Sequence, residues 1–285
     1  MKTAFVILCY GKYEMTIECI EKILALEVSD DSEIVIVDNA SPDDTGKKIQ
    51  SKYKEIKNIH VLLNDKNDGY AKGNNKGYQY AVTELNCDCV VVMNNDAFID
   101  DRQFLVKLSA IISKEKDISI IAPDIRGNTI KHQNPLWVGE FTREDAVGNI
   151  IKNTVSNILL TLHVDYYRKK KNKEKDDITP EKQYGIMPHG ACIIYCNDWV
   201  KNESKAFCSW TFLFCEEIFL YKYCKEKEYK SVYTPEIALR HIGDASISEQ
   251  SGTERKRRIF INRNQTKSLF KYLKFARDAK ANWNC

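Results

Sequence analysis

The feature that most constrains the fold of this chain is a regular alternation of short apolar runs with helix-like segments over residues 1–123. The apolar runs are rich in valine and isoleucine and predict buried strands at residues 3–10, 33–38, 59–63, 89–93 and 118–123. The segments between them predict helices at residues 13–26, 73–85 and 104–112, and another that begins at Ser41 and Pro42. Repeated strand–helix units form a mainly parallel sheet with helices on both faces, so the predicted fold class is α/β.

The alternation stops near residue 124. Residues 124–185 show no regular pattern. The charged run at 168–177 within them is typical of a solvated loop, with partner binding as the weaker interpretation. Regular patterns return later and predict strands at 190–196, 231–234 and 238–242, a helix at 216–227, and one long or two short helices at 254–280.

Charge and cysteine content narrow the function classes. Residues 253–285 hold ten Lys and Arg against two Asp and Glu, whereas the whole chain holds 43 against 40. The basic excess is therefore confined to the tail, which argues against nucleic acid as a partner. None of the ten cysteines has CxxC spacing, so we expect buried, reduced thiols and a cytoplasmic location. No stretch approaches the length of a membrane span.

Polar residues follow each of the first four predicted strands, at Tyr10, at Asp38 and in segments 64–75 and 94–96. The carboxyl ends of parallel strands share one edge of a sheet, so a ligand site is predicted there. The first turn has a single glycine and the chain has no GxxxxGK[ST] loop, so neither a dinucleotide fingerprint nor a P-loop is present. The turn at 94–96 (NND) offers oxygen ligands that suit Mn²⁺ or Mg²⁺, although a simple turn explains it equally well.

Taken in order, seven segments resemble the motifs of family 2 glycosyltransferases with the GT-A fold, of the rhamnosyltransferase-like kind. They are 37–41 (VDNAS), 67–75 (NDGYAKGNN), 94–96 (NND), Gly190-Ala191, 214–217 (FCEE), His241 with Ser246, and Arg263-Asn264. Each motif is weak alone, but the ordered set spans nearly the whole chain. The resemblance implies a GT-A fold, with a mainly parallel nucleotide-binding sheet and a C-terminal helical appendage.

The resemblance also implies a role for individual positions. Glu217 is the implied catalytic base, and Asp96 and His241 are the implied ligands of Mn²⁺ or Mg²⁺. The implied donor-nucleotide contacts are Tyr10, Asp38, Asn67, Lys72, Asn94 and Asn95, and the implied acceptor contacts are Gly190, Ala191 and Glu216. Two departures stand out: position 217 is Glu where the family often has Asp, and residues 128–184 match no motif.

The implied activity is inverting transfer of a sugar from a nucleotide-diphosphate sugar to a glycan or lipid-linked saccharide, in cell-surface polysaccharide synthesis. Such a transfer needs a base for the acceptor hydroxyl and an electrophile at the departing diphosphate. Adjacent residues of a helix point about 100° apart, so at most one of Glu216 and Glu217 serves as base. A charged first helical turn is the structural alternative. A sugar-phosphate nucleotidyltransferase and a catalytically silent sugar-nucleotide-binding subunit remain alternative functions.

We expect a glycosyltransferase domain over residues 1–252, with a nucleotide-binding half at 1–123 and an acceptor-binding half at 124–252. A basic helical segment would follow at 253–285, in which Leu269, Phe270, Leu273 and Ala276 form a predicted apolar stripe. Packing of this stripe on the domain is the favoured interpretation. Peripheral contact with an anionic membrane surface, at the inner face of the cell membrane, would also suit a basic helix and a lipid-linked acceptor.

Overall fold

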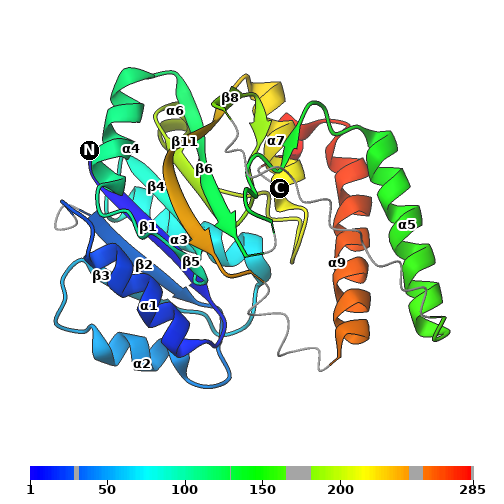
Figure 1. Ribbon diagram of the computed structural model, residues 1–285, viewed down its shortest axis with the longest axis horizontal. Helices are drawn as coiled ribbons and strands as arrows, with labels where there is room; N and C mark the ends of the chain where they lie inside the picture. The colour runs from blue at the N-terminus through cyan, green and yellow to red at the C-terminus, as the bar shows by residue number, and fades with distance from the viewer. Residues whose placement is uncertain (29–31, 129, 165–180, 244–252, 284–285) are drawn as a thin grey trace.

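A large sheet forms the centre of the molecule in the computed structural model, which describes residues 1–28, 32–128, 130–164, 181–243 and 253–283. Its strands are β1 (Thr3–Cys9), β2 (Ser32–Asp38), β3 (Ile59–Leu63), β4 (Cys89–Asn94), β5 (Ala97–Phe98), β6 (Ile118–Gly127), β8 (Gln183–Tyr184), β10 (Cys192–Cys196) and β11 (Lys230–His241). Their order is β3-β2-β1-β4-β10-β6-β11-β5, with β8 also paired to β11 (Figure 1). Strands β7 (Trp137–Val138) and β9 (Ile186–Met187) form a separate ribbon.

The sheet is mainly parallel, which confirms the predicted fold class. Strand β1 pairs in parallel with β2 and β4, β2 with β3, and β6 with β11. Strand β10 is the main antiparallel strand and lies between β4 and β6. Since β10 runs the other way, its first residues lie at the same edge as the last residues of β1, β4 and β11.

Helices cover both faces of the sheet. They are α1 (Tyr13–Leu24), α2 (Thr45–Lys52), α3 (Gly69–Thr83), α4 (Phe104–Lys114), α5 (Arg143–Thr161), α6 (Asp198–Asn202), α7 (Glu216–Lys227), α9 (Glu254–Phe275) and α10 (Ala279–Trp283). Alternation along β1 supplies both cores. Phe5 and Ile7 join α1 and α4 on one face, whereas Ala4 and Val6 join α3, α7 and α9 on the other.

Two glycines let α3 lie unusually close to the sheet. A Cβ atom at Gly73 would lie 2.5 Å from Leu8, and one at Gly77 would lie 2.4 Å from the Val6 side chain. The two glycines are four residues apart, so they share the face of α3 that meets the sheet. Part of the glycine- and amide-rich segment that follows β3 therefore serves packing rather than ligand binding.

Two predicted helix starts were wrong. Helix α2 begins at Thr45 rather than at Ser41 and Pro42, because the Ser41 hydroxyl already binds the Asp38 carboxylate and the Gly11 N–H and does not cap a helix. Helix α3 begins at Gly69, four residues before the predicted start. Glycine has low helix propensity, and Gly69 and Gly73 stand at either end of this missed segment, which hid it in the sequence.

The segment expected to be irregular contains the 19-residue helix α5. Its N-terminus has a capping box between Thr142 and Asp145, but asparagine, glycine and threonine weaken the pattern inside it. The two strands predicted near the end of the domain are one strand, β11, with an irregularity between Thr234 and Ala238. The charged run at 168–177 and Ser246 lie outside the described residues.

The C-terminal helices pack on the core largely through the predicted stripe, since Leu273 and Ala276 are partly buried against it. Leu269 is buried as expected, whereas Phe270 is 58% exposed, and Tyr272 and Phe275 are buried instead. Beyond them, the Trp283 ring stacks on Tyr223, with 4.2 Å between centroids. Aromatic partners on α7 therefore select the face of α9 that is buried. Within the described residues, no helix is long and apolar enough to cross a membrane.

A matched pair of glycine substitutions tests the packing of α3. Gly77→Ala should destabilise the protein by about 1–3 kcal/mol, because the new methyl group overlaps the Val6 side chain. The control is Gly148→Ala in α5, where a Cβ atom has nothing within 4 Å. That change should stabilise the protein by about 0.5–1 kcal/mol through helix propensity alone. Urea denaturation measures both, and a stabilising Gly77→Ala would contradict the close approach.

Candidate active site

A cleft of about 780 Å³ opens at the edge of the sheet where β1, β4 and β11 end and β10 begins. Most of the residues predicted to form the site line it: Tyr10, Asn67, Asn94, Asn95, Asp96, Gly190, Ala191, Glu216, Glu217 and His241. They come from segments more than 200 residues apart in the chain. The fold therefore gathers them at the sheet edge where parallel α/β proteins bind ligands.

The two predicted metal ligands are in direct contact. Asp96 follows β4, His241 ends β11, and the Asp96 Oδ1 and His241 Nε2 atoms are 3.2 Å apart. The short strand β5 fixes this approach, since His241 pairs with Ala97 and the Ile242 N–H donates to the Asp96 carbonyl. Both side chains are almost fully buried.

Two further side chains that the sequence analysis missed hold His241 in place. The Gln133 Oε1 atom lies 2.8 Å from His241 Nδ1 and orients the ring so that Nε2 faces the Asp96 carboxylate. The His189 ring packs edge-on against His241, with 5.7 Å between centroids. Gln133 lies in the segment that matched no motif, whereas His189 directly precedes Gly190-Ala191 and was detectable from that position.

His189 stays neutral near pH 7. Burial lowers the pKa of His189 to about 4, and the neighbouring His241 acts in the same direction. Its Nδ1 accepts the Ala191 N–H at 3.1 Å, and its backbone N–H donates to Asn134 Oδ1 at 2.7 Å. These contacts fix the loop that leads into β10.

The acid pair lies in the first turn of α7. Phe214 and Cys215 both have positive φ angles, 70° and 71°, which is rare for residues other than glycine. This tight turn directs Glu216 and Glu217 toward the cleft. Glu217 Oε1 accepts the Gly190 N–H at 3.0 Å, and a Cβ atom at Gly190 would lie 2.5 Å from the same oxygen. Position 190 therefore requires glycine for the carboxylate to reach the backbone.

The two carboxyl groups have different surroundings. Glu216 is 3% exposed and its Oε1 has no hydrogen-bond partner among the described residues, whereas Glu217 is partly exposed in the cleft. Burial raises the pKa of Glu216, and the charge of Glu217 raises it further. Burial also raises the pKa of Glu217, although N–H donors, including that of Gly190, oppose the shift. Of the two, Glu217 therefore carries the negative charge more readily.

An amide network shapes the cleft beside β2. Asn39 Nδ2 donates to Asn67 Oδ1 at 2.9 Å, and Asn67 Oδ1 also accepts the Gly69 N–H. The Tyr70 hydroxyl donates to the Gly190 carbonyl at 2.6 Å, which ties α3 to the start of β10. Asn39 and Tyr70 line the cleft, and both lie inside or beside motifs that the sequence analysis had already identified.

Two predicted donor contacts do not line the cleft. Asp38 is buried and binds Ser41 and the Cys9 thiol, so it orders the loop after β2. Lys72 is exposed on α3 and is absent from the cleft wall. Asn95 lines the cleft, but its Nδ2 donates to Thr16 on α1 at 3.0 Å.

The donor set around Asp96 fits a divalent cation that shares its ligands with a substrate. Among the described residues, no group of three or more His, Cys, Asp and Glu could hold a metal ion. A carboxylate and an imidazole are nevertheless suitable ligands for Mn²⁺ or Mg²⁺, and phosphate oxygens commonly complete such a shell. Asp96 and His241 would hold the ion.

Comparisons of the sequence with known proteins match glycosyltransferases. The model of the family described as "Glycosyl transferase family 2" matches residues 4–187. A curated relative, the low-salt glycan biosynthesis hexosyltransferase Agl10 of Haloferax volcanii, is 32% identical over 104 residues, which is 36% of this chain and 32% of the relative. The match therefore spans about a third of that relative's length.

Solved structures share the fold. The mannosyltransferase PcManGT of Pyrobaculum calidifontis, solved with GDP-Man and Mn²⁺, has a TM-score of 0.57 and 12% identity over 96% of this chain and 70% of its own. GalNAc-T7 with UDP, GalNAc and Mn²⁺ has a TM-score of 0.57 and 12% identity over 85% and 44%. S. aureus TarS 1–349 with UDP has a TM-score of 0.53 and 15% identity over 85% and 60%.

The buried Glu216 predicts a pH-dependent stability difference. Its raised pKa keeps it protonated in the folded state at pH values where the unfolded chain has ionised, so the wild type loses stability as pH rises above about 4.3 toward the raised pKa. Glu216→Gln mimics the neutral acid. It should raise Tm by about 2 °C or more at pH 8, and this advantage should shrink toward pH 5.

Calorimetric scans at several pH values measure this difference. Glu55→Gln, at an exposed carboxyl group, is the matched control and should show no such trend. A Glu216→Gln advantage that is the same at pH 5 and pH 8 would mean that Glu216 is ionised in the folded protein.

Proposed function

The chain belongs to glycosyl transferase family 2, and on that premise we propose that it transfers a sugar from a nucleotide-diphosphate sugar to a hydroxyl group of a glycan or lipid-linked saccharide, with inversion. One observation carries the proposal: a single cleft contains both the Asp96–His241 pair and the carboxylate of Glu217. The first suits the donor diphosphate and the second suits the acceptor hydroxyl. Synthesis of a cell-surface polysaccharide is the setting we propose.

In this mechanism Glu217 is the general base. The acceptor oxygen forms a bond to the anomeric carbon from the face opposite the diphosphate, the bond from that carbon to the phosphate oxygen breaks, and the hydroxyl proton passes to the Glu217 carboxylate. The Gly190 N–H keeps Glu217 oriented. Its partial exposure in the cleft and its hydrogen bond from Gly190 distinguish it from the buried Glu216, which we assign to acceptor binding together with Gly190 and Ala191.

On the donor side we propose that Tyr10, Asn67, Asn94 and Asn95 contact the nucleotide, because they line the part of the cleft beside β1, β2 and β4. Asp38 would act by ordering the loop through Ser41, and Lys72 would contact only a donor that extends beyond the cleft wall. A Mn²⁺ or Mg²⁺ ion held by Asp96 and His241 would neutralise charge on the departing diphosphate.

The proposed division of the chain follows this assignment. Residues 1–123 supply the nucleotide-binding half and 124–252 the acceptor-binding half, with 253–285 as a basic helical segment. None of the nine described cysteines forms a disulfide, which supports a reaction in the reducing cytoplasm. Thermal-shift measurements with a panel of nucleotide sugars, with and without Mn²⁺, test which donor the protein binds. The panel should include a rhamnosyl donor, because the ordered motifs resemble those of the rhamnosyltransferase-like subgroup.

Substitution of the acid pair tests the assignment of the base. Glu217→Gln keeps the shape of the side chain and removes its basicity, so turnover should fall by about a hundredfold or more, while donor affinity stays nearly unchanged. Glu216→Gln should mainly raise the KM for the acceptor. Glu228→Gln, at the other end of α7, is the control.

Steady-state kinetics with both substrates separate the two effects. Exchanged phenotypes would make Glu216 the base. If neither substitution lowers turnover, the proposed mechanism at α7 is wrong.

The metal prediction concerns the order of binding. Asp96 is the single carboxylate of the proposed pair, so Mn²⁺ should bind weakly alone and at least about tenfold more tightly with the nucleotide diphosphate that completes its shell. Calorimetric titration of UDP and GDP with and without Mn²⁺ measures this coupling. Asp96→Asn should abolish it, whereas Asp198→Asn, at an exposed position of α6, should not. Equal nucleotide affinity in both conditions, with activity surviving a chelator, would refute the metal assignment.

A further inference from the structure

Helix α5 presents an apolar stripe that the core does not use. The helix buries Ala146 and Ile150 toward the rest of the protein. A second set of aliphatic side chains, spaced by three or four residues, is 43–67% exposed: Val147, Ile151, Val155, Ile158 and Leu162. At about 100° per residue these five positions fall within one narrow arc. We call them the α5 stripe.

The α5 stripe lies on the outer face of the molecule and does not contribute to the core. Helix α9 lies between α5 and the sheet, so α5 is the outermost helix on this side of the molecule (Figure 1). Hydrogen bonds from Asn153 to Gln265 and from Asn262 to Ser156 join the two helices through their polar faces. The α5 stripe is on the other side of the helix. A contiguous exposed row of this kind is typical of an interaction surface.

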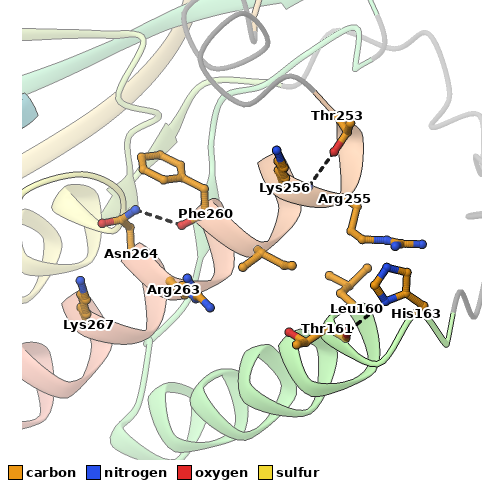
Figure 2. A pocket seen from close by; sticks show the side chains of 11 residues that line it. Leu160, Thr161, His163, Thr253, Arg255, Lys256, Phe260, Arg263, Asn264 and Lys267 are labelled. Carbon is orange, nitrogen blue, oxygen red and sulfur yellow. Dashed lines mark hydrogen bonds between the residues drawn. The ribbon is translucent and has the colours of Figure 1, made fainter.

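The helix beside it is strongly basic. Helix α9 holds eight Lys and Arg and one acid, Glu254. An open groove of about 740 Å³ lies between its N-terminal half and the end of α5 (Figure 2). Leu160, Ile259 and Phe260 supply apolar surface to this groove, and the cations that line it include Lys256, Arg263 and Lys267. Apolar and cationic side chains therefore line the same groove between the two helices.

The charge of α9 distinguishes three partners that could cover the α5–α9 face: a second copy of the chain, a nucleic acid and a lipid bilayer. A second copy of the chain would bring two α9 helices of the same positive charge toward each other, which is unfavourable. A nucleic acid would satisfy the cations but leave the aliphatic stripe in water. An anionic lipid bilayer suits both kinds of side chain. Its acyl chains bury the aliphatic side chains, and its phosphate groups pair with the charged ends of the Lys and Arg side chains.

We propose that the α5–α9 pair is a docking surface for an anionic membrane, on which the protein lies peripherally. The α5 stripe enters the boundary between headgroups and acyl chains, and Lys256, Arg263 and Lys267 contact lipid phosphates. Phe260 lines both the groove and the active-site cleft, so docking brings the acceptor side of the cleft close to the lipid surface. The inference goes beyond the proposed transfer reaction, and its test does not depend on that reaction.

Vesicle co-sedimentation of the full chain tests the proposal. Binding to vesicles containing 30 mol% phosphatidylglycerol at low salt should exceed binding to pure phosphatidylcholine by about tenfold or more. It should fall steeply as the salt concentration rises, because surface charge attraction is screened within a Debye length.

Two variants separate the apolar and the charged contributions. Ile151→Ser with Ile158→Ser removes two stripe side chains and should weaken binding by at least about tenfold. Lys256→Gln, Arg263→Gln and Lys267→Gln together should weaken it by about a hundredfold, at roughly fivefold for each cation. Val147→Ser with Val155→Ser repeats the first test at two other exposed positions.

Matched controls lie on or just after α2 and on α4, which are on the other side of the molecule from the helix pair (Figure 1). Ile56→Ser with Val106→Ser changes two exposed aliphatic side chains, and Lys47→Gln, Lys52→Gln and Lys54→Gln change three exposed lysines. Both controls should bind vesicles like the wild type, and circular dichroism should show that all variants are folded.

Three outcomes would overturn the proposal. The first is no binding of the wild type to anionic vesicles. The second is wild-type binding by both variants of the α5 stripe, which would reduce the interaction to non-specific attraction by the tail. The third is a dimer in analytical ultracentrifugation that Ile151→Ser with Ile158→Ser dissociates, which would assign the face to a second copy of the chain.

Discussion

The direction of one strand is the constraint on which the rest of the site depends. Strand β10 runs antiparallel between the parallel strands β4 and β6, so its start meets their ends. The Asn94 N–H donates to the Ala191 carbonyl at 3.0 Å, which locks the end of β4 to the start of β10. Gly190 and His189 are thereby held at the mouth of the cleft, where one binds Glu217 and the other packs on His241. Had β10 been parallel, these contacts would lie at the opposite edge of the sheet.

The cleft separates its charges in a way that suits the proposed chemistry. On the sheet side, Asp96 and His241 pair a carboxylate with an imidazole that Gln133 orients. On the helix side, Glu216 and Glu217 share the first turn of α7, and burial favours their protonated forms. The Gly190 N–H donates to Glu217 and favours its charged form. Neighbouring residues of one type therefore acquire different protonation behaviour from their surroundings alone.

The pair of helices α5 and α9 forms the surface that we propose contacts the membrane. Helix α9 packs on the core through Leu269, Tyr272 and Phe275, so the basic segment is part of the folded body. Helix α5 then packs on α9 through amide side chains and leaves its aliphatic stripe outside. Helix α5 also buries Ala146 and Ile150, so it carries aliphatic side chains on both its inner and its outer face. A surface helix usually has a polar outer face, and the exposed aliphatic row is the physical basis for the proposed membrane contact.

The sequence by itself determined the parallel α/β core. Valine- and isoleucine-rich runs predict strands and helical spacing predicts helices, and both patterns can be recognised within a short segment without knowledge of its tertiary contacts. It also determined which polar residues follow each strand, and hence most of the cleft wall. Only the tertiary structure decided that Asp38 and Lys72 stay off that wall and that Gln133 and His189 support His241. It also decided that Tyr272 and Phe275 are buried while Phe270 is exposed on α9. These outcomes depend on which side chains meet across long separations in sequence, and neither spacing nor composition encodes that geometry locally. Helix α5 is the clearest case: its Asn- and Thr-rich face becomes intelligible only once α9 lies against it.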